Sequence, residues 1–238
     1  MQHASGMEWR KPHRRQMQFE CDEQSLVFHM HDLFIAGWTG RDADAVEHHI
    51  AELEAIGIPR PRTTPMFYRV GTNLLTTDVQ VDVTGPDTSG EVECVLVSLP
   101  KGLFVGVGSD HTDRKVEAYG VTVSKQVCPK PMCKHLWPMQ EVIEHWDSLI
   151  LRSWVTCDGV RRLYQEGSVA KMLSPSELIG RYTLINGLFD FGTVMFGGTL
   201  PVMEGISGGE RFEMELEDPV LKRSLEHAYV IRSLAFTD

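Results

Sequence analysis

The stretch Ser89-Gly90-Glu91-Val92-Glu93-Cys94-Val95-Leu96-Val97 has two carboxylates two residues apart at the head of an apolar run. In a β-strand, residues two apart point to the same face, so Glu91 and Glu93 would present their negative charges side by side. Like charges held together raise a pKa or require a cation, and paired carboxylate oxygens suit Mg²⁺, Mn²⁺ or Ca²⁺. The alternative is the solvent-facing edge of a half-buried strand.

The composition indicates a globular protein with an acidic balance. The chain has 238 residues and a formal net charge of −10 at pH 7. This charge argues against nucleic acids or anionic membranes as the main partner, because both bind basic surfaces. No apolar run reaches membrane-span length and no secretory signal pattern opens the chain, so we expect a cytoplasmic protein. The five cysteines include no Cys-x-x-Cys pair, which favours reduced thiols over disulfides or structural zinc.

Strand signals recur at short spacing along the chain and predict an α+β domain that is mostly β. Residues 1–25 are expected to form a polar, loose N-terminal arm, followed by a single domain over 26–238. Two strands should precede a helix over about 41–56, and the alternation at 79–83 predicts another strand. Later strands are predicted at 91–98, 103–107, 120–127, 149–156, 192–197, 210–217 and 226–234, with short helices near 113–118, 138–145 and 175–184.

Several short segments occur in the order typical of the fumarylacetoacetate hydrolase superfamily. His49-Ile50-Ala51-Glu52 is similar to its early His-x-x-Glu helix, Phe67-Tyr68-Arg69 to its aromatic and cation, and Glu91-Val92-Glu93 to its Glu-x-Glu pair. Residues 157–172, 192–201 and 208–216 resemble its later motifs. The chain over roughly 33–235 therefore resembles a divergent subfamily of these fumarylacetoacetase C-terminal-domain-like proteins. The resemblance implies a mixed β-roll or barrel with a few short helices that carries Mg²⁺ or Mn²⁺, or else Ca²⁺.

The chain departs from this family at the third metal ligand, an aspartate after a later strand. The strand predicted at 120–127 carries Lys125 and Gln126 at the corresponding place. We expect Gln126 to serve as a neutral ligand, or Lys125 to neutralise the carboxylate pair or act as an amine nucleophile. Asp110 or Asp113 could supply the missing carboxylate by a different route. The alternative for these two is a helix N-cap with acids in its first turn.

The resemblance also implies roles for side chains outside the Glu-x-Glu pair. His49, oriented by Glu52, would activate water, although an unremarkable exposed helix pair is the alternative. The expected catalytic residues are His49, Glu52 and Lys125. The expected substrate-binding residues are Arg69, Lys130, Gly198 and Thr199. An arginine suits a substrate carboxylate, and a Gly-Gly-Thr turn lets the backbone approach a ligand.

The leading hypothesis is a divalent-metal-dependent hydrolase that cleaves a carbon–carbon bond in a small 2-oxo or 1,3-dicarbonyl carboxylic acid through an enolate. A decarboxylase, hydratase or tautomerase of the same superfamily would share the metal and the enolate, and the fold does not separate them. A non-catalytic binding protein that has lost the metal site is the alternative from another class. The resemblance also implies a homodimer.

Overall fold

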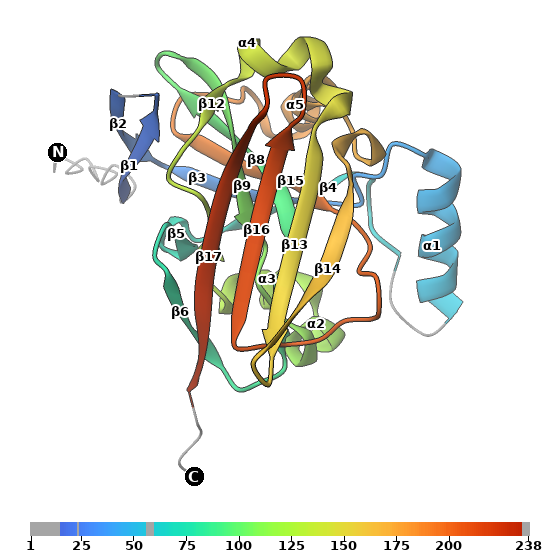
Figure 1. Ribbon diagram of the computed structural model, residues 1–238. Helices are drawn as coiled ribbons and strands as arrows, with labels where there is room; N and C mark the ends of the chain where they lie inside the picture. Colours follow the sequence, from blue (N-terminus) through green and yellow to red (C-terminus); the bar gives the residue numbers. More distant parts are fainter. Residues whose placement is uncertain (1–14, 23, 56–59, 235–238) are drawn as a thin grey trace, which may run out of the picture.

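Two β-sheets pack face to face in the computed structural model, which describes residues 15–22, 24–55 and 60–234 (Figure 1). The six-stranded sheet has the order β12-β9-β8-β15-β3-β4 and the five-stranded sheet the order β14-β13-β16-β17-β6. The strands of the first are β3 (Asp32–Gly37), β4 (Met66–Val70), β8 (Val92–Leu99), β9 (Gly102–Ser109), β12 (Trp137–Pro138) and β15 (Thr193–Thr199). Those of the second are β6 (Gln80–Thr84), β13 (Ile150–Cys157), β14 (Val160–Ser168), β16 (Arg211–Asp218) and β17 (Arg223–Leu234).

Strand β8 lies inside the six-stranded sheet with every residue buried. Val92, Cys94 and Leu96 pack into the cluster between the two sheets, while Val95 and Val97 pack into a second cluster on the other face. A strand covered on both faces reads as an uninterrupted apolar run, as the sequence does from residue 94. The carboxylates that precede this run therefore sit at the end of a rigid, central strand.

The second cluster is covered by a hairpin of β1 (Arg15–Cys21) and β2 (Gln24–Met30). Met17 and Phe19 are buried there, so residues 15–21 form a strand where the sequence suggested a loose arm. In residues 15–21, apolar side chains alternate with Gln and Glu, which is the two-residue period of a strand. The polar composition of the whole N-terminal segment outweighed this short pattern in the prediction. Residues 1–14 of the expected arm lie outside the described residues.

Five α-helices are described, and most are short. They are α1 (Ala43–Ala55), α2 (Arg114–Tyr119), α3 (Val121–Val127), α4 (Met139–Val142) and α5 (Pro175–Asn186). Helix α1, at the side of the molecule in Figure 1, begins after Asp42, whose carboxylate accepts hydrogen bonds from the N–H groups of Asp44 (3.0 Å) and Ala45 (3.1 Å). The short 3-10 helices are η1 (Thr72–Leu74), η2 (Ile143–Ser148) and η3 (Val169–Lys171). The two-residue strands outside the two large sheets are β5 (Leu75–Thr76), β7 (Thr88–Ser89), β10 (Thr112–Asp113) and β11 (Lys130–Pro131).

Helix α3 overturns the strand predicted at 120–127. Its sequence is rich in β-branched residues, which favour strands. Tertiary packing prevails, because the helical spacing buries Ser124 and Lys125 on one side while Thr122 and Val123 stay exposed. The mostly β, α+β fold is otherwise confirmed, with β14 as an additional strand.

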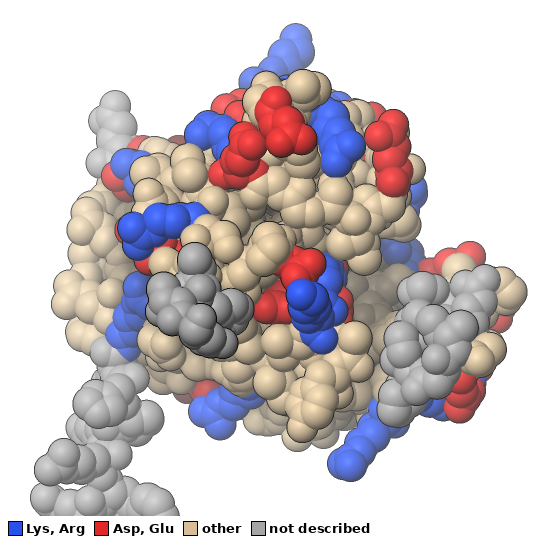
Figure 2. Space-filling view, turned by 90° about the horizontal axis from the view of Figure 1, so that it is seen from below, with Lys and Arg blue, Asp and Glu red and all other residues tan. Residues whose placement is uncertain are grey.

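The surface charges and the cysteines can be compared with the expectations from composition. On the face seen from below in Figure 2, basic side chains of the described residues are mixed with acidic ones. Among the ion pairs of the described residues are Lys115–Asp87 and Arg232–Asp82. All five cysteines are free, as the sequence predicted. Among the described residues, no helix combines the length and apolar character needed to span a membrane.

Candidate metal centre

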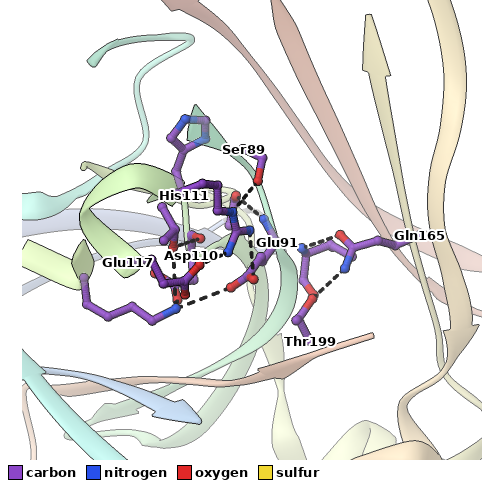
Figure 3. A network of polar contacts seen from close by, with 12 residues as sticks. Ser89, Glu91, Asp110, His111, Glu117, Gln165 and Thr199 are labelled. Carbon is purple, nitrogen blue, oxygen red and sulfur yellow. Dashed lines mark hydrogen bonds and ion pairs between the residues drawn. The ribbon is translucent and has the colours of Figure 1, made fainter. Parts of the chain in front are cut away.

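Three carboxylates meet where strand β8 begins and strand β9 ends. The two strands pair antiparallel, with Glu93 opposite Gly108, and the N–H of Asp110 donates to the carbonyl of Glu91 at 3.0 Å. This pairing brings Asp110 beside the Glu-x-Glu pair. One carboxylate oxygen each of Glu91, Glu93 and Asp110 lies within 4.8 Å of the other two, as Figure 3 illustrates around Glu91 and Asp110. Three oxygen ligands of this kind fit a hard divalent cation.

Two lysines neutralise Asp110, which has no exposed surface. The Nζ of Lys125 contacts Asp110 Oδ2 and lies 3.5 Å from Glu91 Oε2. The Nζ of Lys130 lies 2.8 Å from Asp110 Oδ1 and donates to the carbonyl of His111 at 2.6 Å. Burial alone would raise the pKa of Asp110, but the two ammonium groups outweigh it and lower this pKa to about 2. Asp110 is therefore an anion at neutral pH.

Lys125 stays protonated in this cluster. Burial lowers the pKa of Lys125, but Asp110 and Glu91 outweigh that effect, so the pKa lies above its ordinary value. An ammonium group has no electron pair with which to attack a carbonyl carbon. The neutralising role considered for Lys125 thus agrees with its contacts, and the amine-nucleophile role does not.

Arg114 orients Glu91 and was not singled out by the sequence. Its Nη2 lies 2.9 Å from Glu91 Oε1, its Nη1 lies 2.7 Å from Glu117 Oε2, and its Nε donates to Ser89 Oγ at 2.8 Å. Asp113, by contrast, caps helix α2, because its Oδ1 accepts from the N–H groups of Lys115 and Val116 at 3.0 Å. The helix-cap interpretation is thus confirmed for Asp113, while Asp110 supplies the third carboxylate.

Glu93 has an anomalous pKa. Burial, followed by the charges of Asp110 and Glu91, raises the pKa of Glu93 well above its ordinary value. Its Oε2 accepts a hydrogen bond from the N–H of Gly198 at 2.7 Å. The network described around it holds three basic groups and four acidic ones: Lys125, Lys130 and Arg114 against Glu91, Glu93, Asp110 and Glu117. Because the raised pKa favours the protonated form of Glu93, the other six charges balance, and a cation that binds here would take the place of the proton of Glu93.

A β-bulge in β15 presents Gly198 to Glu93. The pairing of β15 with β8 shifts register between Phe196 and Thr199, so the N–H of Gly198 is free to bind the carboxylate. Gly198 has a φ of 97°, and a Cβ there would lie 1.8 Å from Thr39 Oγ1. Only glycine fits this position. The sequence predicted that its backbone would approach a substrate, whereas its N–H donates to the carboxylate of Glu93.

Gln126 lies outside the carboxylate cluster, contrary to the expected ligand role. It is exposed on helix α3, where its Oε1 accepts from the N–H of Gly71 at 3.0 Å and its Nε2 donates to the carbonyl of Arg69 at 2.9 Å. The ligand role was assigned to Gln126 because residues 120–127 were predicted to form a strand, whereas Gln126 lies on helix α3. In a strand Lys125 and Gln126 would point to opposite faces, and the family pattern assigned the inward face to Gln126.

The expected substrate-binding side chains are already engaged in the structure. Lys130 has no exposed surface and contacts Asp110, so it holds the carboxylate cluster instead of facing a ligand. Arg69 is exposed, and its Nη2 lies 2.5 Å from Asp32 Oδ1. The hydroxyl of Thr199 donates to the carbonyl of Val92 at 2.8 Å. These contacts argue against direct substrate roles for Lys130 and Thr199.

His49 and Glu52 lie on helix α1, but their side chains fall outside the described residues. Their proposed role in water activation therefore stays a prediction.

A cavity of about 390 Å³ lies between the β1–β2 turn and the start of α4, lined by Cys21, Lys101 and Met139 among others, and none of its lining residues belongs to the carboxylate cluster.

Comparison with known proteins connects this geometry to a family and a fold. The chain matches the family model described as "Protein of unknown function (DUF2848)" over residues 36–229. No curated protein matches it. Among solved structures it is similar to the fumarylpyruvate hydrolase of Pseudomonas aeruginosa in complex with Mn²⁺ and pyruvate, with a TM-score of 0.62, 16% identity and coverage of 95% of this chain and 100% of that one.

Two further structures share the architecture. A yeast protein of the fumarylacetoacetate hydrolase family has a TM-score of 0.61 at 15% identity, covering 86% of this chain and 94% of its own. The 5-carboxymethyl-2-hydroxymuconate delta-isomerase of Mycobacterium smegmatis has a TM-score of 0.58 at 15% identity, covering 87% and 80%. At these identities the likeness shows a common fold, which confirms the fold expected from the sequence.

Proposed function

Because the chain belongs to the DUF2848 family and has the fold of fumarylacetoacetate hydrolases, we propose that it is a divalent-metal-dependent enzyme. The reaction we propose is cleavage of a carbon–carbon bond in a small 2-oxo or 1,3-dicarbonyl carboxylic acid, through an enolate. The observation that carries this proposal is the convergence of the partly buried Glu91 with the buried Glu93 and Asp110. A related lyase or tautomerase reaction would use the same site.

The three carboxylates would hold Mg²⁺ or Mn²⁺. When bound, such an ion polarises the oxygens of a 2-oxo acid and stabilises the negative charge of an enolate. The chain's own contribution is to fix the ligands: Arg114 orients Glu91, and the N–H of Gly198 orients Glu93. Ligands held in this way need no rearrangement during the reaction.

Lys125 has a second task under this proposal. Its ammonium is the only cation of the network described here that contacts two of the three carboxylates, Asp110 and Glu91. It limits the repulsion between these acids when the ion leaves. It also keeps a proton and a positive charge beside the site, where an enolate oxygen would be stabilised.

A metal-free binding protein is the second candidate, and one observation favours it. The Nζ of Lys125 already bridges Asp110 and Glu91, so the ammonium would supply the charge that the ion supplies otherwise. Under this alternative Glu93 stays protonated and no divalent ion binds.

Thermal melting with Mn²⁺ and with EDTA separates the two candidates. An ion that binds only the native state raises the melting temperature of a metal enzyme. Glu93→Gln should remove this shift and abolish turnover of 2,4-dioxo acids, followed as release of pyruvate. Glu213→Gln, a partly buried acid that pairs with Arg161 on another strand, is the matched control and should behave as the wild type. No shift of the wild type with Mn²⁺ or Mg²⁺ would favour the binding protein.

The homodimer stays a prediction from the family resemblance. Static light scattering at micromolar concentration checks it, and a mass equal to one chain of 26.9 kDa would contradict it.

A further inference from the structure

The amide of Gln165 lies behind the carboxylate cluster with all of its hydrogen-bonding capacity in use. It is fully buried on β14, in the five-stranded sheet. Its Oε1 accepts from the N–H of Val92 at 3.0 Å and from Ser153 Oγ at 2.9 Å. Its Nε2 donates to Thr199 Oγ1 at 2.8 Å and to the carbonyl of Leu200 at 2.6 Å. Two acceptor and two donor positions are filled, which fixes the orientation of the amide.

Thr199 completes a loop of hydrogen bonds around Val92, as Figure 3 shows. Its hydroxyl accepts from Gln165 and donates to the carbonyl of Val92 at 2.8 Å. Both backbone polar groups of Val92 are therefore bound by side chains. Val92 is the residue between Glu91 and Glu93, so this contact fixes the backbone from which both carboxylates project.

The bulge in β15 explains why side chains replace the usual strand ladder here. Pairing of β8 with β15 runs from Val97 and Val194 to Val95 and Phe196, and resumes only at Glu93 and Thr199. The bulge gives the N–H of Gly198 to the carboxylate of Glu93. The hydrogen bonds of Val92 must then come from another source, because a buried backbone group without a partner is costly.

We infer that Gln165 and Thr199 are positioning residues that set where Glu91 and Glu93 converge. The pair joins the two sheets, since Gln165 comes from the five-stranded sheet and Thr199 and Val92 from the six-stranded one. Neither side chain would touch the substrate or the ion. The inference rests on the proposed function in so far as the convergence point is a cation site.

Thr199→Val tests the inference with little change of volume. It removes the hydroxyl and should raise the Kd for Mn²⁺ by about 10-fold or more, the usual effect of losing a residue that orients metal ligands. Thr199→Ser keeps the hydroxyl and should restore binding close to the wild type. Gln165→Met, which removes all four bonds, should raise the Kd further.

Tyr164→Phe is the matched control. Tyr164 neighbours Gln165 on β14, is buried, and accepts a hydrogen bond from the N–H of Ser207 at 3.2 Å. Losing this bond should lower the melting temperature without changing the Kd for Mn²⁺. Electron paramagnetic resonance of free Mn²⁺ measures the Kd of each folded variant, and an unchanged Kd in Thr199→Val overturns the inference even if its melting temperature falls.

A second measurement keeps the inference separate from the proposed function. If wild-type protein binds no Mn²⁺, the metal function fails, and amide hydrogen exchange over residues 91–94 decides the positioning role. Faster exchange there in Thr199→Val than in Thr199→Ser or Tyr164→Phe supports the pair. Equal exchange in the three variants overturns it.

Discussion

The ammonium nitrogen of Lys130 lies 2.8 Å from Asp110 Oδ1, and neither side chain has any exposed surface. Lys130→Met would leave part of a buried charge without its partner. We expect it to lower the free energy of unfolding by about 3–5 kcal/mol, measured by urea unfolding. Lys101→Met, at an exposed lysine bonded to Gln24, is the control and should change stability by about 0.5 kcal/mol or less. Wild-type stability with weaker substrate binding would return Lys130 to the substrate-contact role suggested by the sequence.

Lys125→Met should tighten the binding of Mn²⁺. The ammonium group competes with an ion for Asp110 and Glu91, so its removal leaves more negative charge for the ion. We expect a decrease in Kd of about tenfold, equivalent to about 1.4 kcal/mol, by isothermal titration calorimetry. Without metal the same variant should be less stable. Lys115→Met, which removes an exposed partner of Asp87, should leave the Kd unchanged. Weaker Mn²⁺ binding in Lys125→Met would contradict this competition.

Gln126→Asp should leave the affinity for Mn²⁺ unchanged, because Gln126 is exposed and bonded to the backbone of Gly71 and Arg69. Asp110→Asn should abolish binding, because it removes a charged ligand. Calorimetric titration of both variants compares the two positions directly. Tighter binding in Gln126→Asp would show that this side chain reaches the ion after all.

Acid stability should depend on Asp218, a buried carboxylate that is not part of the Glu91–Glu93–Asp110 cluster and whose Oδ1 lies 2.9 Å from His145 Nε2. Burial raises the pKa of Asp218, but the N–H of Leu221 and the imidazole of His145 outweigh it and hold this pKa below its ordinary value of 3.8. A carboxylate whose folded pKa is depressed adds stability above its unfolded pKa, and this stability is lost as the pH falls through the folded pKa.

Asp218→Asn should therefore lower the free energy of unfolding at neutral pH, and its difference from the wild type should shrink below pH 3.8. Urea unfolding at several pH values measures the two curves. A difference that stays constant with pH would show that the loss comes from packing and not from the charge.

Local patterns were sufficient for most strands of the two sheets and for the Glu-x-Glu pair, because alternation and apolar runs follow from which faces are buried. They missed β1 and β14 and predicted a strand where helix α3 lies. They were insufficient for Asp110, whose place beside Glu91 depends on the pairing of β8 with β9. Lys125 was correctly considered as a partner of the carboxylates. The sequence placed it on a strand, but it lies on helix α3. Gln165 lies in the segment 157–172 that resembles a family motif, but no role could be assigned to it, since its partners other than Ser153 are 34 to 73 residues away along the chain.

The hairpin of β1 and β2 has a practical consequence for recombinant work. Family similarity begins at residue 36, after both strands, yet the hairpin covers an apolar sheet face that includes Val95 and Phe196. A chain trimmed to the limits of similarity would keep Glu91, Glu93 and Asp110 but would lose the hairpin and most of the interior strand β3, and so expose that face to water. Exposed apolar sheets associate with one another, so such a chain should precipitate or form soluble aggregates even though no site residue is missing.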